Sequence, residues 1–202
     1  MKKYELTGET KTITKFFDEE KTLHRIRAVI DFASIKAGDT GGWIESEENL
    51  SHKGNAWVYD NAEVYGNAEV YGDAEVYGDA KAWGDAEVYG NAEVYGDAKV
   101  YGDAEVYGNA EVWVDAKVFS RNHVLVIGPI GSRSDFTTFY RGKGKTIMVK
   151  CGCFNDSIEK FLNRAAQTHG ESKHAIAYQK AAELAELQID LLEESPEGRD
   201  RP

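Results

Sequence analysis

Few residues of this chain are suited to chemistry: five histidines, two cysteines and one short basic segment. Both cysteines lie in the motif Cys151-Gly152-Cys153. Residues two apart on a strand share a face, so a strand here would place the two thiols side by side. A tetrahedral zinc site needs two more ligands and uses wider cysteine spacing. We therefore predict half-buried apolar thiols, with no metal site and no cofactor.

The basic segment lies between Gly131 and Lys150, where lysine and arginine outnumber the single acid, Asp135. Guanidinium groups and main-chain amides together suit an anionic small molecule such as a nucleotide. The competing interpretation is a solvated hairpin that docks against the acidic middle of its own chain or of a neighbouring subunit. The candidate ligand-binding residues are Ser132, Arg133, Thr137, Thr138, Arg141, Lys143 and Lys145.

The element that must position these groups is the middle of the chain. Residues 55–120 consist of eleven consecutive six-residue repeats, for the most part Asn/Asp-Ala-Glu-Val-Tyr-Gly. A period of six is a multiple of the strand period of two and not of the helical 3.6. Alanine and valine therefore point to one side, and the charged and aromatic residues to the other. Glycine followed by Asn or Asp suits a corner, so the repeats predict a β-solenoid.

The lysines indicate the number of sides in each coil. Lys81, Lys99 and Lys117 recur at every third repeat. A three-sided coil, made of three repeats, would stack them in one column, where like charges repel. We expect neighbouring aspartates to relieve this repulsion, namely Asp79, Asp97 and Asp115. The other two columns would be Trp57, Glu75, Glu93 and Glu111, and Glu69, Glu87, Glu105 and His123.

Charge and hydropathy limit the partners of the chain. Residues 55–120 hold 14 acidic and three basic side chains, which accounts for the whole net charge of −11. With a pI near 5.0, direct nucleic-acid binding is not expected. The chain has no run of 18 apolar residues and no apolar leader after Met1. We therefore expect no membrane contact and a cytoplasmic location.

The fifth position of the repeats carries aromatic side chains that point outward. Stacking along the coils explains part of this pattern. So much aromatic surface, rimmed by carboxylates, also favours association, and we predict a homo-oligomer, with a trimer favoured. The residues expected at this surface are Tyr65, Tyr71, Tyr77, Trp83, Tyr89, Tyr95, Tyr101, Tyr107 and Trp113.

The flanking segments are expected to cover the open ends of the solenoid. Upstream, alternation from His24 to Phe32 indicates a half-buried strand. Downstream we predict strands over 124–127, 137–141 and 146–150 and two helices. The first helix would have a capping box of Asp156 and Glu159 and a stop at Gly170, and the second would span about 173–193. The predicted division is a β cap over 1–54, the solenoid over 55–126, an α+β module over 127–194 and a flexible tail over 195–202.

Two stretches carry a resemblance to known proteins. They are DFASIKAGDTGGWIESEENLSHKGNAWVYDNA, followed by the repeats, and VLVIGPIGSRSDFTTFYRG with the later CGCF and THG. With these stretches the chain resembles uncharacterised, acetyltransferase-like hexapeptide-repeat proteins of bacteria, phages and prophages. The resemblance implies a mainly β fold built on a left-handed β-helix, a phage or prophage origin and a host bacterial cytoplasm as location. It brings no established activity.

Three functions stay open at this point. Left-handed β-helices often serve as trimeric acyl-CoA-dependent acetyltransferases, which need a histidine general base. The repeats hold no histidine, so we assign no catalytic residue and expect solvated side chains for His24, His52, His123, His169 and His174. Rows of acids could mimic DNA, but the lysine column interrupts them. We favour a non-catalytic binding protein, a rigid acidic solenoid that engages a host protein or a nucleotide-type anion and acts in counter-defence.

Overall fold

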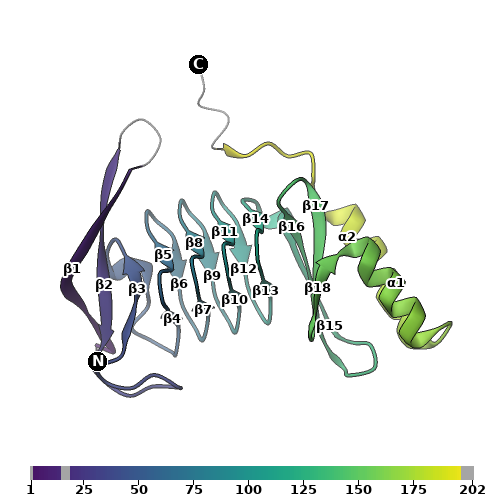
Figure 1. The fold of residues 1–202 in the computed structure, drawn as a ribbon, viewed down its shortest axis with the longest axis horizontal. Coiled ribbons are helices and arrows are strands. Elements are labelled where there is room, and N and C mark those ends of the chain that lie inside the picture. Colours follow the sequence, from purple (N-terminus) through teal and green to yellow (C-terminus); the bar gives the residue numbers. More distant parts are fainter. Residues whose placement is uncertain (1, 15–18, 197–202) are drawn as a thin grey trace.

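The computed structural model describes residues 2–14 and 19–196. An N-terminal β-hairpin, a stack of coils and a C-terminal α+β unit follow one another along the molecule (Figure 1). The strands outside the repeats are β1 (Tyr4–Thr14), β2 (Glu20–Ala28), β3 (Thr40–Ile44), β15 (Val124–Ile130), β16 (Asp135–Gly142), β17 (Thr146–Cys151) and β18 (Phe154–Ser157). The helices are α1 (Ile158–His169) and α2 (Lys173–Gln188), and the 3-10 turns are η2 (Glu47–Asn49) and η3 (Arg121–His123).

The repeats form a mainly β solenoid of about four coils, as the period of six predicts. Each repeat supplies one short strand, and strands three repeats apart pair in parallel, for example Glu93 with both Glu75 and Glu111. The repeat strands are β4 (Trp57–Val58), β5 (Glu63–Val64), β6 (Glu69–Val70), β7 (Glu75–Val76), β8 (Lys81–Ala82), β9 (Glu87–Val88), β10 (Glu93–Val94), β11 (Lys99–Val100), β12 (Glu105–Val106), β13 (Glu111–Val112) and β14 (Lys117–Val118). The three resulting sheets confirm three sides per coil.

The interior of the coils holds the alanine and valine side chains, which are almost completely buried. Most corners carry glycine, although Asp60 and Val114 adopt a positive φ at the equivalent positions, and Gly90 illustrates two reasons for the preference. Its φ is +76°, and a Cβ there would come within 2.9 Å of the Gly108 nitrogen in the next coil. Small residues at the corners therefore allow adjacent coils to approach closely enough for main-chain pairing, with Asn91 N donating to Gly108 O at 2.7 Å.

The column of lysines exists, but its repulsion is relieved differently from the expectation. Lys81 pairs with Lys99 across the sheet, and Lys99 with Lys117. For Lys81 the relief comes from Glu63 in the same column, which lies 2.7 Å from Lys81 Nζ and 2.9 Å from Lys11 Nζ. No corner aspartate forms an ion pair with these lysines in the part of the chain that the structure describes, so Asp79, Asp97 and Asp115 do not have the expected role.

The N-terminal end extends the solenoid by hydrogen bonding. Strand β3 pairs in parallel with β5 of the first coils, and β2 and β1 continue the same sheet outward. The predicted alternation from His24 to Phe32 is only partly correct, because the strand ends at Ala28 and its pairing with β3 shifts register between Arg25 and Arg27. Leu23 and Ile26, three residues apart, point to opposite faces of β2: Ile26 is buried in the core of the coils, and Leu23 is buried beside Trp43 and Tyr65. Strand β1 was not anticipated.

The C-terminal unit is a four-stranded antiparallel sheet, β15-β16-β17-β18, with the two helices on one face. Its other face lies against the last coils of the solenoid (Figure 1). Strand β18 adds to the three predicted strands. Ser157, rather than Asp156, is the N-cap of α1, because its hydroxyl accepts from Lys160 N, whereas Gly170 ends the helix as expected. Helix α2 ends at Gln188, earlier than the predicted 193.

After α2 the chain turns back toward the solenoid (Figure 1). The Ser195 hydroxyl lies 3.0 Å from the Tyr101 hydroxyl, so the start of the predicted flexible tail contacts the coils. The rest of that tail, residues 197–202, lies outside the described residues. None of the helices in the described ranges has the length and apolar character needed to cross a membrane.

Candidate functional site

The structure separates the predicted ligand-binding residues. Thr137 and Thr138 are adjacent on β16 and therefore point to opposite faces of the sheet. Thr138 Oγ1 accepts a hydrogen bond from Glu111 N of the solenoid at 3.0 Å, while Thr137 Oγ1 donates to Cys151 Sγ on the helix side. Lys143 and Lys145 are exposed around the β16–β17 turn. These four residues do not form one site.

The basic residues nearest the solenoid hold the C-terminal unit in place. Arg141 is 5% exposed, and its guanidinium lies 4.6 Å from the centre of the Phe119 ring. Lys150 Nζ lies 2.8 Å from Glu111 Oε2 and 4.6 Å from the centre of the Trp113 ring. These contacts agree with the alternative to a ligand site, in which the basic hairpin docks against the acidic solenoid of its own chain.

Ser132 and Arg133 instead line a pocket of about 340 Å³ on the helix side of the sheet. Its walls are the β15–β16 turn, the β17–β18 turn and both helices. The lining residues are Ser132, Arg133, Asp135, Cys151, Gly152, Cys153, Phe154, Phe161, Arg164, Ala165, Thr168, His169 and Tyr178. Two guanidinium groups and one imidazole thus surround a hollow with an aromatic wall and a single carboxylate.

Tyr178 forms the inner end of this pocket. Burial, with a contribution from Cys151, raises the pKa of Tyr178 to about 12, so the phenol is neutral at physiological pH. The Cys151 thiol points at its hydroxyl from 3.9 Å. Gly131 has a φ of +74°, and a Cβ there would overlap the Tyr178 hydroxyl. The turn that carries Ser132 and Arg133 therefore requires glycine at this position.

Helix α1 supplies the pocket residues that sequence reasoning missed. Phe161 and Ala165 are buried, and Arg164 and Thr168 lie beside them at helical spacing. The sequence did contain a signal for Arg164 as a pocket residue, because this arginine borders the apolar face that predicted the helix. The missing information was that this face folds over the β15–β16 turn.

The cysteine motif does not lie on one strand. Cys151 ends β17, Gly152 has a φ of +56°, and Cys153 is exposed in the turn before β18. The expectation of two thiols on one strand face is therefore wrong, because the chain reverses between them. In the ranges 2–14 and 19–196, no group of three or more His, Cys, Asp or Glu is arranged to hold a metal ion.

His123 is the clearest correction among the histidines. It lies in η3 rather than on the column of Glu69, Glu87 and Glu105, and its side chain is 0% exposed. Its Nδ1 accepts from Phe119 N at 3.3 Å, and its Nε2 lies 3.2 Å from Glu193 Oε2. Burial, together with the nearby Arg141, lowers the pKa of His123.

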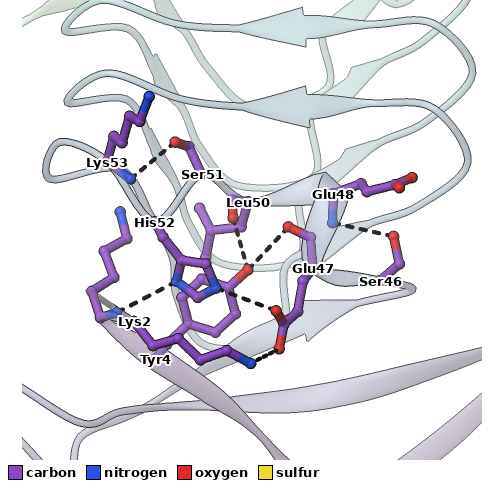
Figure 2. A network of polar contacts seen from close by, with 10 residues as sticks. Lys2, Tyr4, Ser46, Glu47, Glu48, Leu50, Ser51, His52 and Lys53 are labelled. Atoms are coloured by element: carbon purple, nitrogen blue, oxygen red, sulfur yellow. Dashed lines mark hydrogen bonds and ion pairs between the residues drawn. The ribbon is translucent and has the colours of Figure 1, made fainter.

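A second histidine belongs to the polar network at the N-terminal end (Figure 2). The His52 ring stacks on Tyr4, with ring centres 4.2 Å apart. Its Nδ1 accepts from Lys3 N at 3.4 Å, and its Nε2 lies 3.5 Å from Glu47 Oε2. The Tyr4 hydroxyl donates to Leu50 O at 2.7 Å, and burial raises the pKa of Tyr4. One ring nitrogen of His52 thus contacts the main chain just before β1, and the other lies beside Glu47 of η2.

The aromatic residues of the repeats form three ladders with ring centres 4.5–5.8 Å apart. Tyrosine hydroxyls also donate to glutamates of the next coil, as Tyr71 does to Glu87 at 2.6 Å. Two residues expected at an outer surface are buried within the chain, Tyr65 beside Leu23 and Tyr101 beneath the C-terminal segment. Tyr95 and Tyr107 remain about two-fifths exposed, at 43% and 41%. Self-association through the ladders stays a prediction.

Three-sided coils built from six-residue repeats define the fold as that of a hexapeptide-repeat β-solenoid protein. Over 63 residues the chain is 40% identical to a protein of Escherichia coli (strain K12) named uncharacterized acetyltransferase YdcK. The matched stretch covers 30% of this chain and only 19% of that protein. No protein-family model matches the chain. The fold and this match together fit a hexapeptide-repeat protein. The similarity to the acetyltransferase-like relative is limited to less than a third of the present chain.

Proposed function

We propose that this chain is a non-catalytic binding protein that holds a small anionic ligand of the nucleotide type in the pocket between the C-terminal sheet and its helices. The observation that carries the proposal is that Arg133 of the β15–β16 turn and Arg164 of α1 both line that pocket. Neither arginine forms an ion pair with any residue of the described ranges, whereas Arg141 and Lys150 are engaged by the solenoid. Two unpaired guanidiniums suit a phosphate or carboxylate group.

The shape of the pocket supports a ligand with an apolar or aromatic part. Phe154, Phe161 and Ala165 line the pocket together with the two arginines. The volume of about 340 Å³ lies at the small end of the range for ligand sites. A mononucleotide has a flat ring that suits the aromatic side chains of this pocket and an anionic group that suits its two arginines.

Calorimetric titration of the purified chain tests the proposal. Mononucleotides, inorganic phosphate and acetyl-CoA are titrated in turn against the wild type, Arg133→Ala and Arg164→Ala. Loss of one charge-assisted contact should weaken nucleotide binding by about 10- to 100-fold. Lys145→Ala, which removes an equal charge from an exposed turn, is the matched control and should leave the affinity unchanged. Equal loss in the control, or no binding of any anion, would refute the proposal.

Acyl transfer is the second candidate, and the name of the Escherichia coli relative favours it. An acetyltransferase needs a general base, and His123 and His52 are both engaged in structural contacts. His169 borders the pocket and is the residue to test. Release of free CoA from acetyl-CoA in the presence of amine acceptors, abolished in His169→Gln, would establish this candidate in place of the first.

A host protein as partner, and a role in counter-defence of a phage or prophage, belong to the same proposal. The acidic solenoid supplies the surface for such a partner, with 14 acidic against three basic residues over 55–120. Capture from bacterial lysate, compared between the wild type and a Glu87→Gln, Glu93→Gln, Glu105→Gln variant, tests it. Loss of a DNA-binding protein in the variant would support the DNA-mimic alternative instead.

A further inference from the structure

Helix α2 has a second face that the ligand pocket does not use. One side of the helix packs on the sheet and on α1 through Tyr178, Ala181, Ala182 and Ala185, all of which are buried. The opposite side carries Ile176, Leu184 and Leu187, which are 52%, 47% and 86% exposed. Lys180 and Glu183 lie between Ile176 and Leu187 on this side of the helix, so the exposed stripe combines apolar and charged side chains. Exposed apolar residues rimmed by polar ones mark an interaction surface.

The charges along this stripe change sign from one end to the other. Lys173 and Lys180 lie in the first half of α2, while Glu183 lies in the second half and Asp190 just beyond it. Lys180 Nζ and Glu183 Oε2 are 2.7 Å apart, near the middle of the stripe. The surface is therefore complementary to itself once it is reversed in direction.

We propose that a second copy of this chain packs its α2 antiparallel against this stripe, about a two-fold axis at the level between residues 181 and 182. In this arrangement Ile176 of one copy contacts Leu187 of the other. Lys180 of each copy faces Glu183 of the other, and Lys173 approaches Asp190. A parallel arrangement would instead place lysine against lysine and glutamate against glutamate. An isologous contact of this kind closes as a dimer and does not extend into a fibre.

The size of the surface sets the expected strength of the dimer. A helix of 16 residues is about 24 Å long, so one helix pair buries less area than a standard stable interface. The dimer is therefore expected to depend on concentration. It uses a different surface from the aromatic ladders of the solenoid, so the two modes of association can be told apart by substitution.

Sedimentation equilibrium of the full chain between about 1 and 200 µM tests the proposal. We expect a reversible monomer–dimer equilibrium, with the association constant lowered at least tenfold in Leu187→Glu and in Ile176→Glu. Both side chains are exposed in the single chain, so circular dichroism should show an unchanged fold. Leu192→Glu, at a similarly exposed leucine outside the helix, is the matched control and should dimerise as the wild type does.

Cysteine pairing tests the direction of the helices. In a background of Cys151→Ser and Cys153→Ser, Ile176→Cys and Leu187→Cys chains are mixed and oxidised. Antiparallel packing predicts a disulfide-linked heterodimer and little of either homodimer. The proposal is overturned if the wild type is monomeric throughout the concentration range, if homodimers form as readily as the heterodimer, or if Tyr95→Ser and Tyr107→Ser abolish association while Leu187→Glu does not.

Discussion

The two ends of the solenoid are closed in different ways. At the N-terminal end, β3 pairs directly with β5, so the covering hairpin is part of the longest sheet of the molecule. At the C-terminal end, a separate sheet lies against the last coil through side chains such as Lys150 and Thr138 and one isolated main-chain bridge between Ala116 and Gly142. That unit has its own core beneath its helices. An end joined by main-chain pairing continues the rigid stack, whereas a docked unit with its own core retains a face for a pocket.

The largest effects should come from the two cores. Trp57→Ala removes a ring that is 1% exposed and packs against Tyr4 and Phe32 at the N-terminal end. Phe161→Ala removes a comparably buried ring from the core under the helices. Each change should cost about 3–5 kcal/mol. Hydrogen exchange measured by peptide should speed up from β1 through the coils for Trp57→Ala, but only from β15 to α2 for Phe161→Ala. Equal loosening of the N-terminal hairpin by Phe161→Ala would remove the distinction between the ends.

Asn49 tests how strongly main-chain pairing fixes the N-terminal end. Its side chain is 1% exposed, donates to Gly66 O and Ala68 O, and accepts from Glu45 N and Ser46 N. Asn49→Ala should lower the free energy of unfolding by about 2–3 kcal/mol, because buried main-chain groups lose their partners. Denaturation by urea measures the change. Asn55→Ala, at an exposed asparagine, should have little effect, and an equal loss there would contradict this account.

His123 gives the C-terminal end a pH dependence in the acidic range. Because burial lowers its pKa in the folded chain, the unfolded chain binds more protons below about pH 6.5. The stabilising contribution is therefore present above pH 6.5 and lost as the pH falls below it. We expect the melting temperature to fall by a few degrees between pH 7 and pH 5, and by less in His123→Gln. An unchanged pH profile in that variant would show that His123 does not contribute; His174→Gln serves as the control.

The smallest expected effects lie in the coils between the two ends. Glu93 is flanked by Glu75 and Glu111, and burial followed by these two charges raises its pKa. A raised pKa means stability that is present at low pH and lost as the pH rises through the folded value. Glu93→Lys should therefore stabilise the chain by about 0.5 kcal/mol at pH 7 and by less at pH 4. Thermal melts at the two pH values measure this, and a larger gain at pH 4 would contradict the assignment.

The sequence predicted the solenoid correctly, because the same local pattern recurs in every repeat. It did not predict the pocket, because single tertiary contacts determine which residues line it. The spacing of Lys81, Lys99 and Lys117 at every third repeat predicted three sides per coil, because every repeat obeys the same alternation. The basic segment has no such redundancy. Strand alternation alone separates Thr137 from Thr138, but only the tertiary packing assigns Arg141 to the solenoid and Arg133 to a pocket. Arg164 and Tyr178 reach that pocket from helices whose docking no local pattern specifies.

Because consecutive coils are related by a translation of about 4.8 Å, the solenoid sets the separation of its two ends in fixed steps. Removing or adding three repeats would bring the N-terminal hairpin and the C-terminal pocket nearer or farther by one such step and leave their relative orientation nearly unchanged. The distance between the two end units is thus set by the number of coils and not by the sequence of either unit.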